Sequence, residues 1–218
     1  MRHRTGAAAY VGGEQRREEL MAGDTRIDVR DTPKPQRHAL ILEAFDRLAA
    51  GDSILLTNDH EPRHLREDFE RELPGSFGWE SLGPDEDGSW QVRITKTTRA
   101  PLPRLVADTN ALFADLDPSS AGSVWQLTPA RRDLDANIIA LPAGDAIDTH
   151  DGPGLDVLFV VLSGSGTLGT ETGEIALAPG AVVWLPPRSQ RRIDAGAEGL
   201  RYLTVHHRKP TLSITPRP

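Results

Sequence analysis

Hydrophobic and polar residues alternate in residues 26–30, and a period of two predicts a strand. Beyond a turn, Ile41, Phe45 and Leu48 recur at intervals of three and four residues, which is the spacing of one helix face. Gly51 follows, and glycine is favoured where a helix ends. The pattern therefore opens with a strand and a helix.

The same sequence of element types then repeats. Residues 53–57 (SILLT) predict a second strand, and Leu65, Phe69 and Leu73 form the apolar stripe of a second helix. Two further β-like runs flank the turn-rich segment GPDEDG, which is typical of a hairpin. The predicted order over residues 25–97 is β-α-β-α-β-β, an α+β domain.

The pattern changes in the middle of the chain. Residues 98–122 contain prolines and serines around one helical candidate at residues 105–116, and we expect a linker with a helix. Residues 123–208 consist of short β-like runs separated by turn signals, which favours an all-β sandwich or barrel. Residues 1–24 and 209–218 are expected to be tails.

The amino-terminal segment bears on where the protein works. It is polar, glycine-rich and balanced in charge, so it cannot bury enough surface to become ordered alone. Its apolar centre is too short for a secretory signal, and we expect a cytoplasmic protein. The natural start is either Met1 or Met21.

Composition narrows the classes of function. The 218 residues include no cysteine, which excludes disulfides, thiolate metal sites and cysteine nucleophiles. With 25 basic and 32 acidic residues the chain carries no basic platform, so nucleic acid is not an expected partner. No apolar run approaches the ~20 residues of a membrane span, and no membrane partner is expected.

Two stretches of the first domain resemble a known superfamily. They read IDVRDTPKPQRHALILEAFDRL and LLTNDHEPRHL. Over residues 25–97 the chain is similar to the TusA-like (SirA-like) sulfur carriers, and more closely to a bacterial domain of unknown function that shares their two-layer fold. Sulfur carriers have Cys-Pro-x-Pro before the first helix, where this chain has Thr32. A threonine hydroxyl cannot carry a persulfide, so sulfur transfer is excluded.

The second domain resembles the cupin superfamily of jelly-roll β-barrels. The matching stretches are LPAGDAIDTHDGPGLDVLFVVLSGSGTL and GEIALAPGAVVWLPPRSQRRI, and Gly144 lies six residues before His150 as in the first cupin motif. The resemblance implies a jelly-roll barrel over residues 123–208. It also implies that two copies pair through sheet faces, so a homodimer is expected.

The metal ligands of a cupin are mostly replaced. In the positions implied by the resemblance, His150 is retained, while Gly152 stands for the second histidine, Val157 for the glutamate and Arg191 for the last histidine. A divalent cation needs neutral imidazoles or carboxylates, and an arginine repels it. No cofactor is therefore expected from the motif itself.

One alternative keeps a metal. In the last β-like run, LTVHHR, alternation sends His206 to the same side as Thr204. If that side lines the barrel, His150 and His206 can form a two-histidine site for a divalent metal, completed by water or a carboxylate. The chain would then be a metal-dependent enzyme of the dioxygenase or isomerase type.

Another alternative is a pocket for a small acidic metabolite. Arg191, Arg192 or His150 would hold a carboxylate, and Trp184 and Phe159 would supply apolar walls. A separate alternative has no site, with His206 a hydrogen-bonded wall residue and His150 a relic of the cupin motif. We expect a non-catalytic binding or regulatory protein, although a scaffold with a solidly packed barrel is also open.

The first domain offers a second candidate site at the starts of its two helices. The residues are Arg37, His38, His60, Arg63 and His64. Helix amino termini favour anions, and arginines add donors; the three histidines could instead gather a metal. Helix capping alone would also select the polar residues before the second helix.

Overall fold

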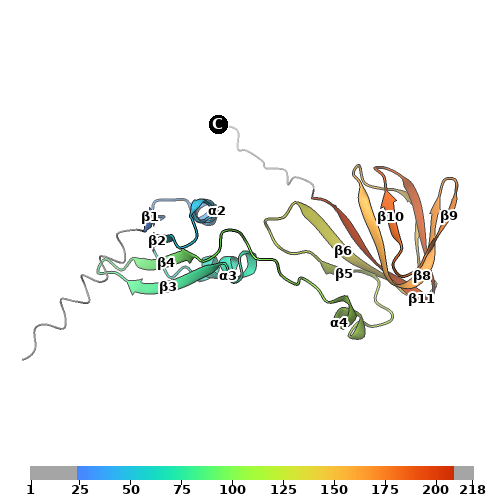
Figure 1. The fold of residues 1–218 in the computed structure, drawn as a ribbon, viewed down its shortest axis with the longest axis horizontal. Coiled ribbons are helices and arrows are strands. Elements are labelled where there is room, and N and C mark those ends of the chain that lie inside the picture. Colours follow the sequence, from blue (N-terminus) through green and yellow to red (C-terminus); the bar gives the residue numbers. More distant parts are fainter. Residues whose placement is uncertain (1–23, 209–218) are drawn as a thin grey trace, which may run out of the picture. The chain divides into compact units, whose positions relative to one another are not determined.

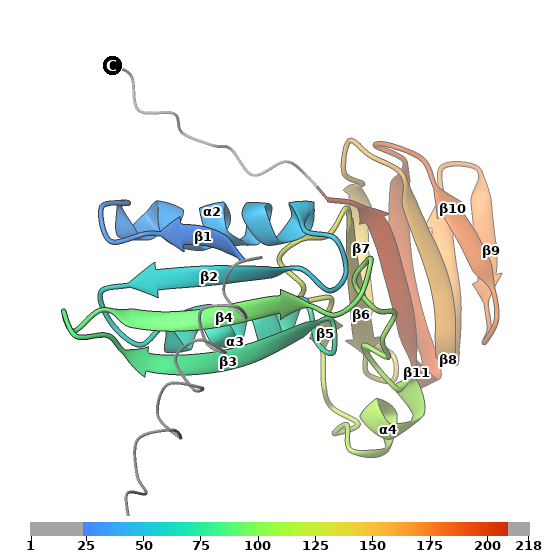
Figure 2. The same cartoon turned by 60° about the vertical axis from the view of Figure 1, so that its left-hand side comes forward.

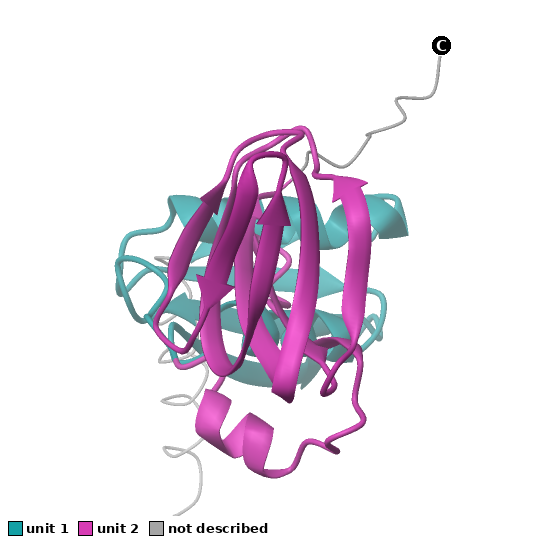
Figure 3. Ribbon diagram, turned by 90° about the vertical axis from the view of Figure 1, so that its right-hand side faces the viewer, with its two compact units in different colours: residues 1–104 teal, residues 105–218 magenta. Residues whose placement is uncertain are grey.

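The computed structural model describes residues 24–208 and divides into two compact units, residues 1–104 and 105–218 (Figure 3). Each unit has its own hydrophobic core and is described by itself. The expected tails, residues 1–24 and 209–218, lie outside the described residues except for Asp24. The two possible start residues, Met1 and Met21, also lie outside them. No helix in the described part is long and apolar enough to cross a membrane.

Unit 1 is a four-stranded sheet with two helices on one face (Figure 2). The strand order is β1-β2-β4-β3, with β1 parallel to β2 and the other pairs antiparallel. The elements are β1 (Thr25–Asp28), α2 (Lys34–Arg47), β2 (Ser53–Asn58), α3 (Arg63–Glu72), β3 (Phe77–Pro84) and β4 (Trp90–Lys96).

The helical stripe residues are buried against the sheet. Ile41 and Phe45 of α2 share one core with Leu65 and Phe69 of α3 and with the inward residues of β2 and β4. Phe69 lies at the centre, with edge-on ring contacts to Phe45, Phe77 and Trp79. The burial of these apolar side chains is what holds both helices on the sheet.

The predicted end of the first helix at Gly51 is wrong. Helix α2 ends at Arg47, because Leu48 already has an extended backbone. Gly51, at φ 101°, instead forms the turn into β2, a conformation that glycine adopts without a steric penalty.

Unit 2 is one seven-stranded sheet folded into a β-sandwich, and two long strands run through both halves of it (Figure 1). The first half of β8 pairs with β10 and with the second half of β11, which pairs in turn with β6, and β6 pairs with β5. The second half of β8 pairs with β9 and with the first half of β11, which also pairs with β7. The elements are α4 (Thr109–Ala114), β5 (Gly122–Gln126), β6 (Leu134–Leu141), β7 (Ala146–Asp151), β8 (Val157–Thr170), β9 (Gly173–Leu177), β10 (Val182–Leu185) and β11 (Gln190–His207).

Glycines allow the two long strands to pass close together. A Cβ on Gly164 would lie 2.1 Å from the carbonyl oxygen of Gly199, and both glycines have positive φ. The pairing register shifts between Ala195 and Leu200 at the same place. Short runs that looked like separate strands in the sequence are therefore parts of the continuous strands β8 and β11. Each of these strands bends and continues into the other half of the sandwich, which is a common way to form its corner.

The predicted helix at residues 105–116 is shorter than expected. It covers Thr109–Ala114 and begins at Asp108, whose side chain accepts hydrogen bonds from two backbone N–H groups. Leu105 is 82% exposed and does not dock on a core. The expectation of a β-rich protein with few helices is confirmed, and unit 2 is consistent with a cupin-like β-sandwich.

Candidate functional site

Arg191 is a buried cation inside unit 2. It lies on β11 opposite His150 of β7, on the same side of the strand as the core residue Ile193, and only 5% of the residue is exposed. Burial lowers the pKa of Arg191, and the charge interaction with Tyr202 acts in the opposite sense. Arginine nevertheless stays protonated at neutral pH, so a full positive charge lies in the sandwich.

The guanidinium of Arg191 has weak partners and no anion. Its Nε donates to the carbonyl oxygen of Ser189 and its Nη2 to the Ser189 hydroxyl, both at 3.3 Å. Among residues 24–208 no carboxylate forms an ion pair with it. A buried charge without a counter-ion is unfavourable unless a ligand or solvent compensates it.

Gly152 leaves the room that the guanidinium occupies. A Cβ built on Gly152 would lie 1.4 Å from Arg191 Nη2 and 2.4 Å from its Cζ. The cupin resemblance gives positions 152 and 191 to metal-binding histidines. In this structure position 191 holds an arginine, and Gly152 leaves the space for its guanidinium. The two replacements are linked sterically.

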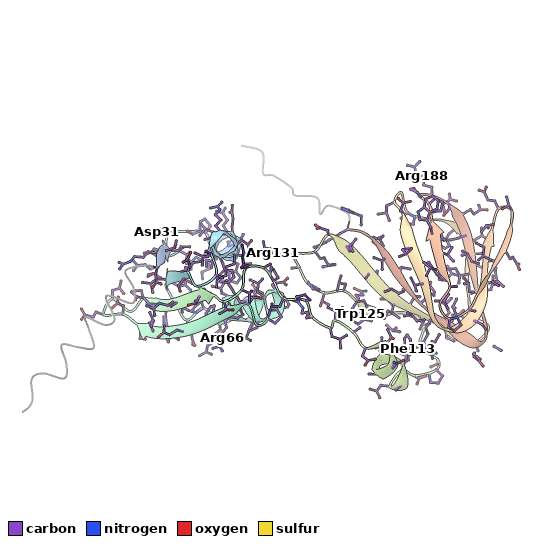
Figure 4. All side chains as sticks on the ribbon, in the orientation of Figure 1. Asp31, Arg66, Phe113, Trp125, Arg131 and Arg188 are labelled. Carbon is purple, nitrogen blue, oxygen red and sulfur yellow. The ribbon has the colours of Figure 1, made fainter. Side chains whose placement is uncertain are left out.

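A cavity of about 430 Å³ opens next to Arg191. The turn at Arg188, which is labelled in Figure 4, lies between the lining residues Pro186 and Ser189, and the backbone N–H of Arg188 donates to the carbonyl oxygen of Pro153. The lining of the cavity combines apolar, hydroxyl and two charged side chains: Leu168, Thr170, Glu171, Thr172, Ile175, Val183, Trp184, Leu185, Pro186, Ser189, Gln190 and Arg191.

The structure places the two predicted wall residues differently. Trp184 lines the cavity but is 64% exposed, and its Nε1 donates to Asp156, so it lies at the rim. Phe159 is fully buried and stacks on Tyr202 with 4.1 Å between ring centres. Phe159 is a core residue and does not line the cavity, because alternation along β8 turns it into the hydrophobic core.

Tyr202 is a residue near Arg191 that the sequence reasoning missed. Burial raises the pKa of Tyr202 to about 12, and Arg191 acts in the opposite sense. Its phenol therefore stays neutral across the physiological range. Alternation along the strand could have identified Tyr202, because it lies two residues before Thr204 and four before His206 and is therefore expected on the same face.

The other polar candidates of unit 2 are on the surface. Arg192 points away from Arg191 along the strand and forms ion pairs with Asp148 and Asp194. His150 is exposed and its Nδ1 contacts the backbone carbonyl of Asp148. Neither residue lines the cavity.

The structure does not bring His150 and His206 into one site. His150 pairs with Arg191 at the start of β11, whereas His206 pairs with Val157 near its end. His206 is half-buried, and its Nδ1 contacts the carbonyl oxygen of His207. Within residues 24–208 no three histidine, aspartate or glutamate side chains are placed to hold one metal ion.

All five candidates of unit 1 line one cavity of about 360 Å³. Its remaining lining is largely apolar and comes from Val29 just after β1, from β2, from the segment before α3 and from the two helices. Neither helix has a side-chain cap at its amino terminus, where Pro33 and Pro62 precede the first turn. The five residues that the sequence places at the two helix starts thus lie together in the structure. A role for them in binding an anion or a metal stays a prediction.

Arg37 is fully committed to the structure around this cavity. Its guanidinium donates to the carbonyl oxygens of Thr32 and Arg30 and to the side chains of Asn58 and Asp59. The hydrogen bond from Arg37, and then that from His60, lower the pKa of Asp59 to about 2. Arg37 therefore joins the turn before α2 to the end of β2 and uses four of its five N–H donors there.

The three histidines of this cavity each face a carboxylate. His38 Nδ1 lies 2.7 Å from Asp68 Oδ2, and His64 Nδ1 lies 3.8 Å from Glu67. Arg63 pairs with Glu61. With Nδ1 turned to the acid, Nε2 is the free ring nitrogen of His38, as in histidines held for ligation or proton transfer.

One family model matches part of the chain, within unit 1. Residues 26–96 match the model of an uncharacterised conserved protein family, DUF2249. The match covers about a third of the chain, so it describes the first unit only. The similarity of residues 25–97 to TusA-like carriers stays a prediction. No curated protein sequence matches the chain.

Several solved structures that are similar to part of the chain are described as cupin proteins. A cupin from Bacteroides fragilis is 21% identical, with 41% of this chain and 80% of that chain covered and a TM-score of 0.35. A cupin superfamily protein from Desulfitobacterium hafniense is 15% identical, with coverage of 50% and 95% and a TM-score of 0.40. A sugar phosphate isomerase of the superfamily from Silicibacter pomeroyi is 19% identical, with coverage of 37% and 54% and a TM-score of 0.34. At these scores the similarities carry no argument about activity.

Proposed function

We propose that unit 2 is a binding module for a small organic acid, whose carboxylate is held by Arg191. The observation that supports the proposal is the buried, unpaired guanidinium at the base of a cavity. A carboxylate is the group that complements a guanidinium best, because two parallel N–H···O bonds and opposite charges combine. The binding would be read out as a regulatory state rather than as turnover.

Several wider expectations belong to the same proposal. Unit 1 would act as a thiol-less TusA-like module that receives or transmits the bound state. The protein would act in the cytoplasm and as a homodimer. These elements rest on the sequence reasoning, and the binding site can be tested without them.

The test is calorimetric titration of the full chain with 4-methylpentanoate, a monocarboxylate with an apolar tail. Arg191→Gln removes the charge and is expected to weaken binding at least about tenfold, since hydrogen bonds to charged groups contribute about 1.5–3 kcal/mol. Arg192→Gln is the matched control, because Arg192 is a neighbouring arginine that already has carboxylate partners. Equal binding by the wild type and Arg191→Gln contradicts the proposal.

Elemental analysis separates this proposal from the metal-dependent alternative. Protein purified without a histidine tag is expected to hold no stoichiometric transition metal. A bound metal that is lost on His150→Ala or His206→Ala would favour an enzyme of the dioxygenase or isomerase type instead.

A further inference from the structure

Two opposite charges line the Arg191 cavity without neutralising each other. Among its described lining residues, Arg191 and Glu171 are the charged ones. They form no ion pair with each other, and Glu171 makes no hydrogen bond or ion pair with any residue in the described part of the chain. The cavity therefore presents both a cation and an anion to a ligand.

The strand register places these charges near one another. In the antiparallel pairing of β11 with β8, Arg192 is opposite Gly169 and Ile193 is opposite Leu168. Continuing that register puts Arg191 beside Thr170, and Glu171 follows at the turn between β8 and β9. A ligand that meets Arg191 is thus within reach of Glu171.

The uncharged lining has a polar part, Thr170, Thr172, Ser189 and Gln190, and an apolar part, which decides what hydrocarbon group a ligand can carry. Leu168 and Leu185 are buried apolar residues, and Val183 lies beside them. These side chains favour a hydrocarbon group, while they offer nothing to a second charge. The volume of about 430 Å³ is within the range of roughly 300–1,000 Å³ that is usual for small-molecule sites.

We infer that the ligand is an amino acid with an apolar side chain. This inference rests on the proposed function and narrows it from organic acids in general to a zwitterion. The carboxylate of the ligand pairs with Arg191, its ammonium group is attracted by Glu171, and its side chain contacts Leu168, Val183 and Leu185. A second carboxylate on the same carbon would be repelled by Glu171.

Four probes with the same isobutyl tail test this selectivity. 4-Methylpentanoate has hydrogen on the carbon next to the carboxylate, 2-hydroxy-4-methylpentanoate has a hydroxyl, leucine has an ammonium group and isobutylmalonate has a second carboxylate. Titration of the full chain is expected to rank leucine first and isobutylmalonate last. The hydroxy acid shows whether a neutral donor is sufficient.

The variants locate the source of the preference. Glu171→Gln is expected to weaken leucine binding about threefold, since an exposed ion pair contributes about 0.2–1 kcal/mol, and to strengthen isobutylmalonate binding. Glu174→Gln is the matched control, because Glu174 is an exposed glutamate of β9 that does not line the cavity. Arg191→Gln is expected to weaken all four probes.

Each outcome decides between the two levels of the proposal. If the four probes bind equally and depend on Arg191, or if Glu171→Gln changes the affinity for neither leucine nor isobutylmalonate, the inference of an amino acid is wrong and the organic-acid site stands. If no probe binds, or if Arg191→Gln has no effect, the organic-acid site is wrong and the amino acid inference falls with it.

Discussion

Gly152 and Arg191 show how two substitutions far apart in the sequence become one structural event. A side chain at position 152 and the guanidinium of Arg191 cannot occupy the same space, because the Cβ would lie 1.4 Å from Nη2. The absence of a side chain at one position is thus the condition for the buried charge at the other.

Gly152→Ala is therefore expected to affect binding more than stability. The atoms in conflict are the far end of a flexible arginine side chain, so the guanidinium can move away at a cost of less than about 2 kcal/mol. Its displacement should weaken 4-methylpentanoate binding at least about tenfold. Titration and urea denaturation measure the two quantities.

The double variant Gly152→Ala/Arg191→Ala provides the control for stability. With the long side chain removed, the added methyl group no longer meets the guanidinium, so the effects of the two changes should not add. Additive losses in the free energy of unfolding would show that Gly152 is needed for another reason.

Tyr202 predicts a specific loss of stability in alkali. Its pKa in the folded protein is about 12, against an ordinary value of 10.0, because of burial. Its contribution is therefore complete below pH 10 and is lost as the pH rises from 10 to 12, since the unfolded state ionises first. The loss amounts to about 3 kcal/mol, taking 1.36 kcal/mol for each of the two units.

Denaturation of the wild type and of Tyr202→Phe over this pH range measures the effect. The phenylalanine keeps the stacking on Phe159 and removes the ionisable group. The variant should lose less stability than the wild type between pH 10 and 12. An equal loss in both proteins would place the alkaline sensitivity elsewhere.

At the scale of elements, the turn between β1 and α2 depends on one side chain. Arg37 belongs to α2, is 8% exposed, and hydrogen-bonds to two carbonyl oxygens of the turn and to Asn58 and Asp59 at the end of β2. It joins three successive elements of unit 1. Lysine keeps the charge but cannot donate in these four directions at once.

Arg37→Lys is expected to destabilise unit 1 by about 1–3 kcal/mol, because buried acceptors lose their donors. Hydrogen exchange followed by mass spectrometry should show faster exchange in α2 and β2, with the strands of unit 2 unchanged. Arg63→Lys is the control, since Arg63 is exposed and pairs only with Glu61. Equal effects of both changes would contradict the role given to Arg37.

At the scale of the whole molecule, the connection between the units is an exposed segment without regular secondary structure. Residues 101–108 form no helix or strand, and Leu105 and Val106 are 82% and 49% exposed. Arg104 just before them donates to the backbone carbonyls of Arg71 and Glu72. Unit 1 thus ends at an anchored residue, and an exposed segment follows.

Mild digestion with thermolysin, which cuts before large apolar residues, is expected to cleave residues 24–208 first at Leu105 or Val106, since proteolysis favours exposed segments without backbone pairing. Mass spectrometry of the early products identifies the cut. The double variant Leu105→Asp/Val106→Asp should slow it. First cleavage within the paired strands of unit 2 would contradict the division.

The sequence alone determined much of the element pattern, because the period of buried positions is local information. The helical spacing of Ile41 and Phe45 and the alternation in β11 follow directly from the geometry of a helix and a strand. The motif positions also singled out Gly152 and Arg191. Which strand runs are continuous is not local, and the bends at Gly164 and Gly199 join runs that looked separate.

Only the tertiary structure decided which residues meet. In the structure the guanidinium of Arg191 occupies the space at Gly152, and His150 lies beside the start of β11 whereas His206 lies near its end. Phe159 is buried in the core, whereas Trp184 is exposed at the rim of the cavity. The physical reason is that burial and unpaired charge arise between elements distant in the chain. Spacing along one strand fixes the side to which a residue points, but not what it finds there.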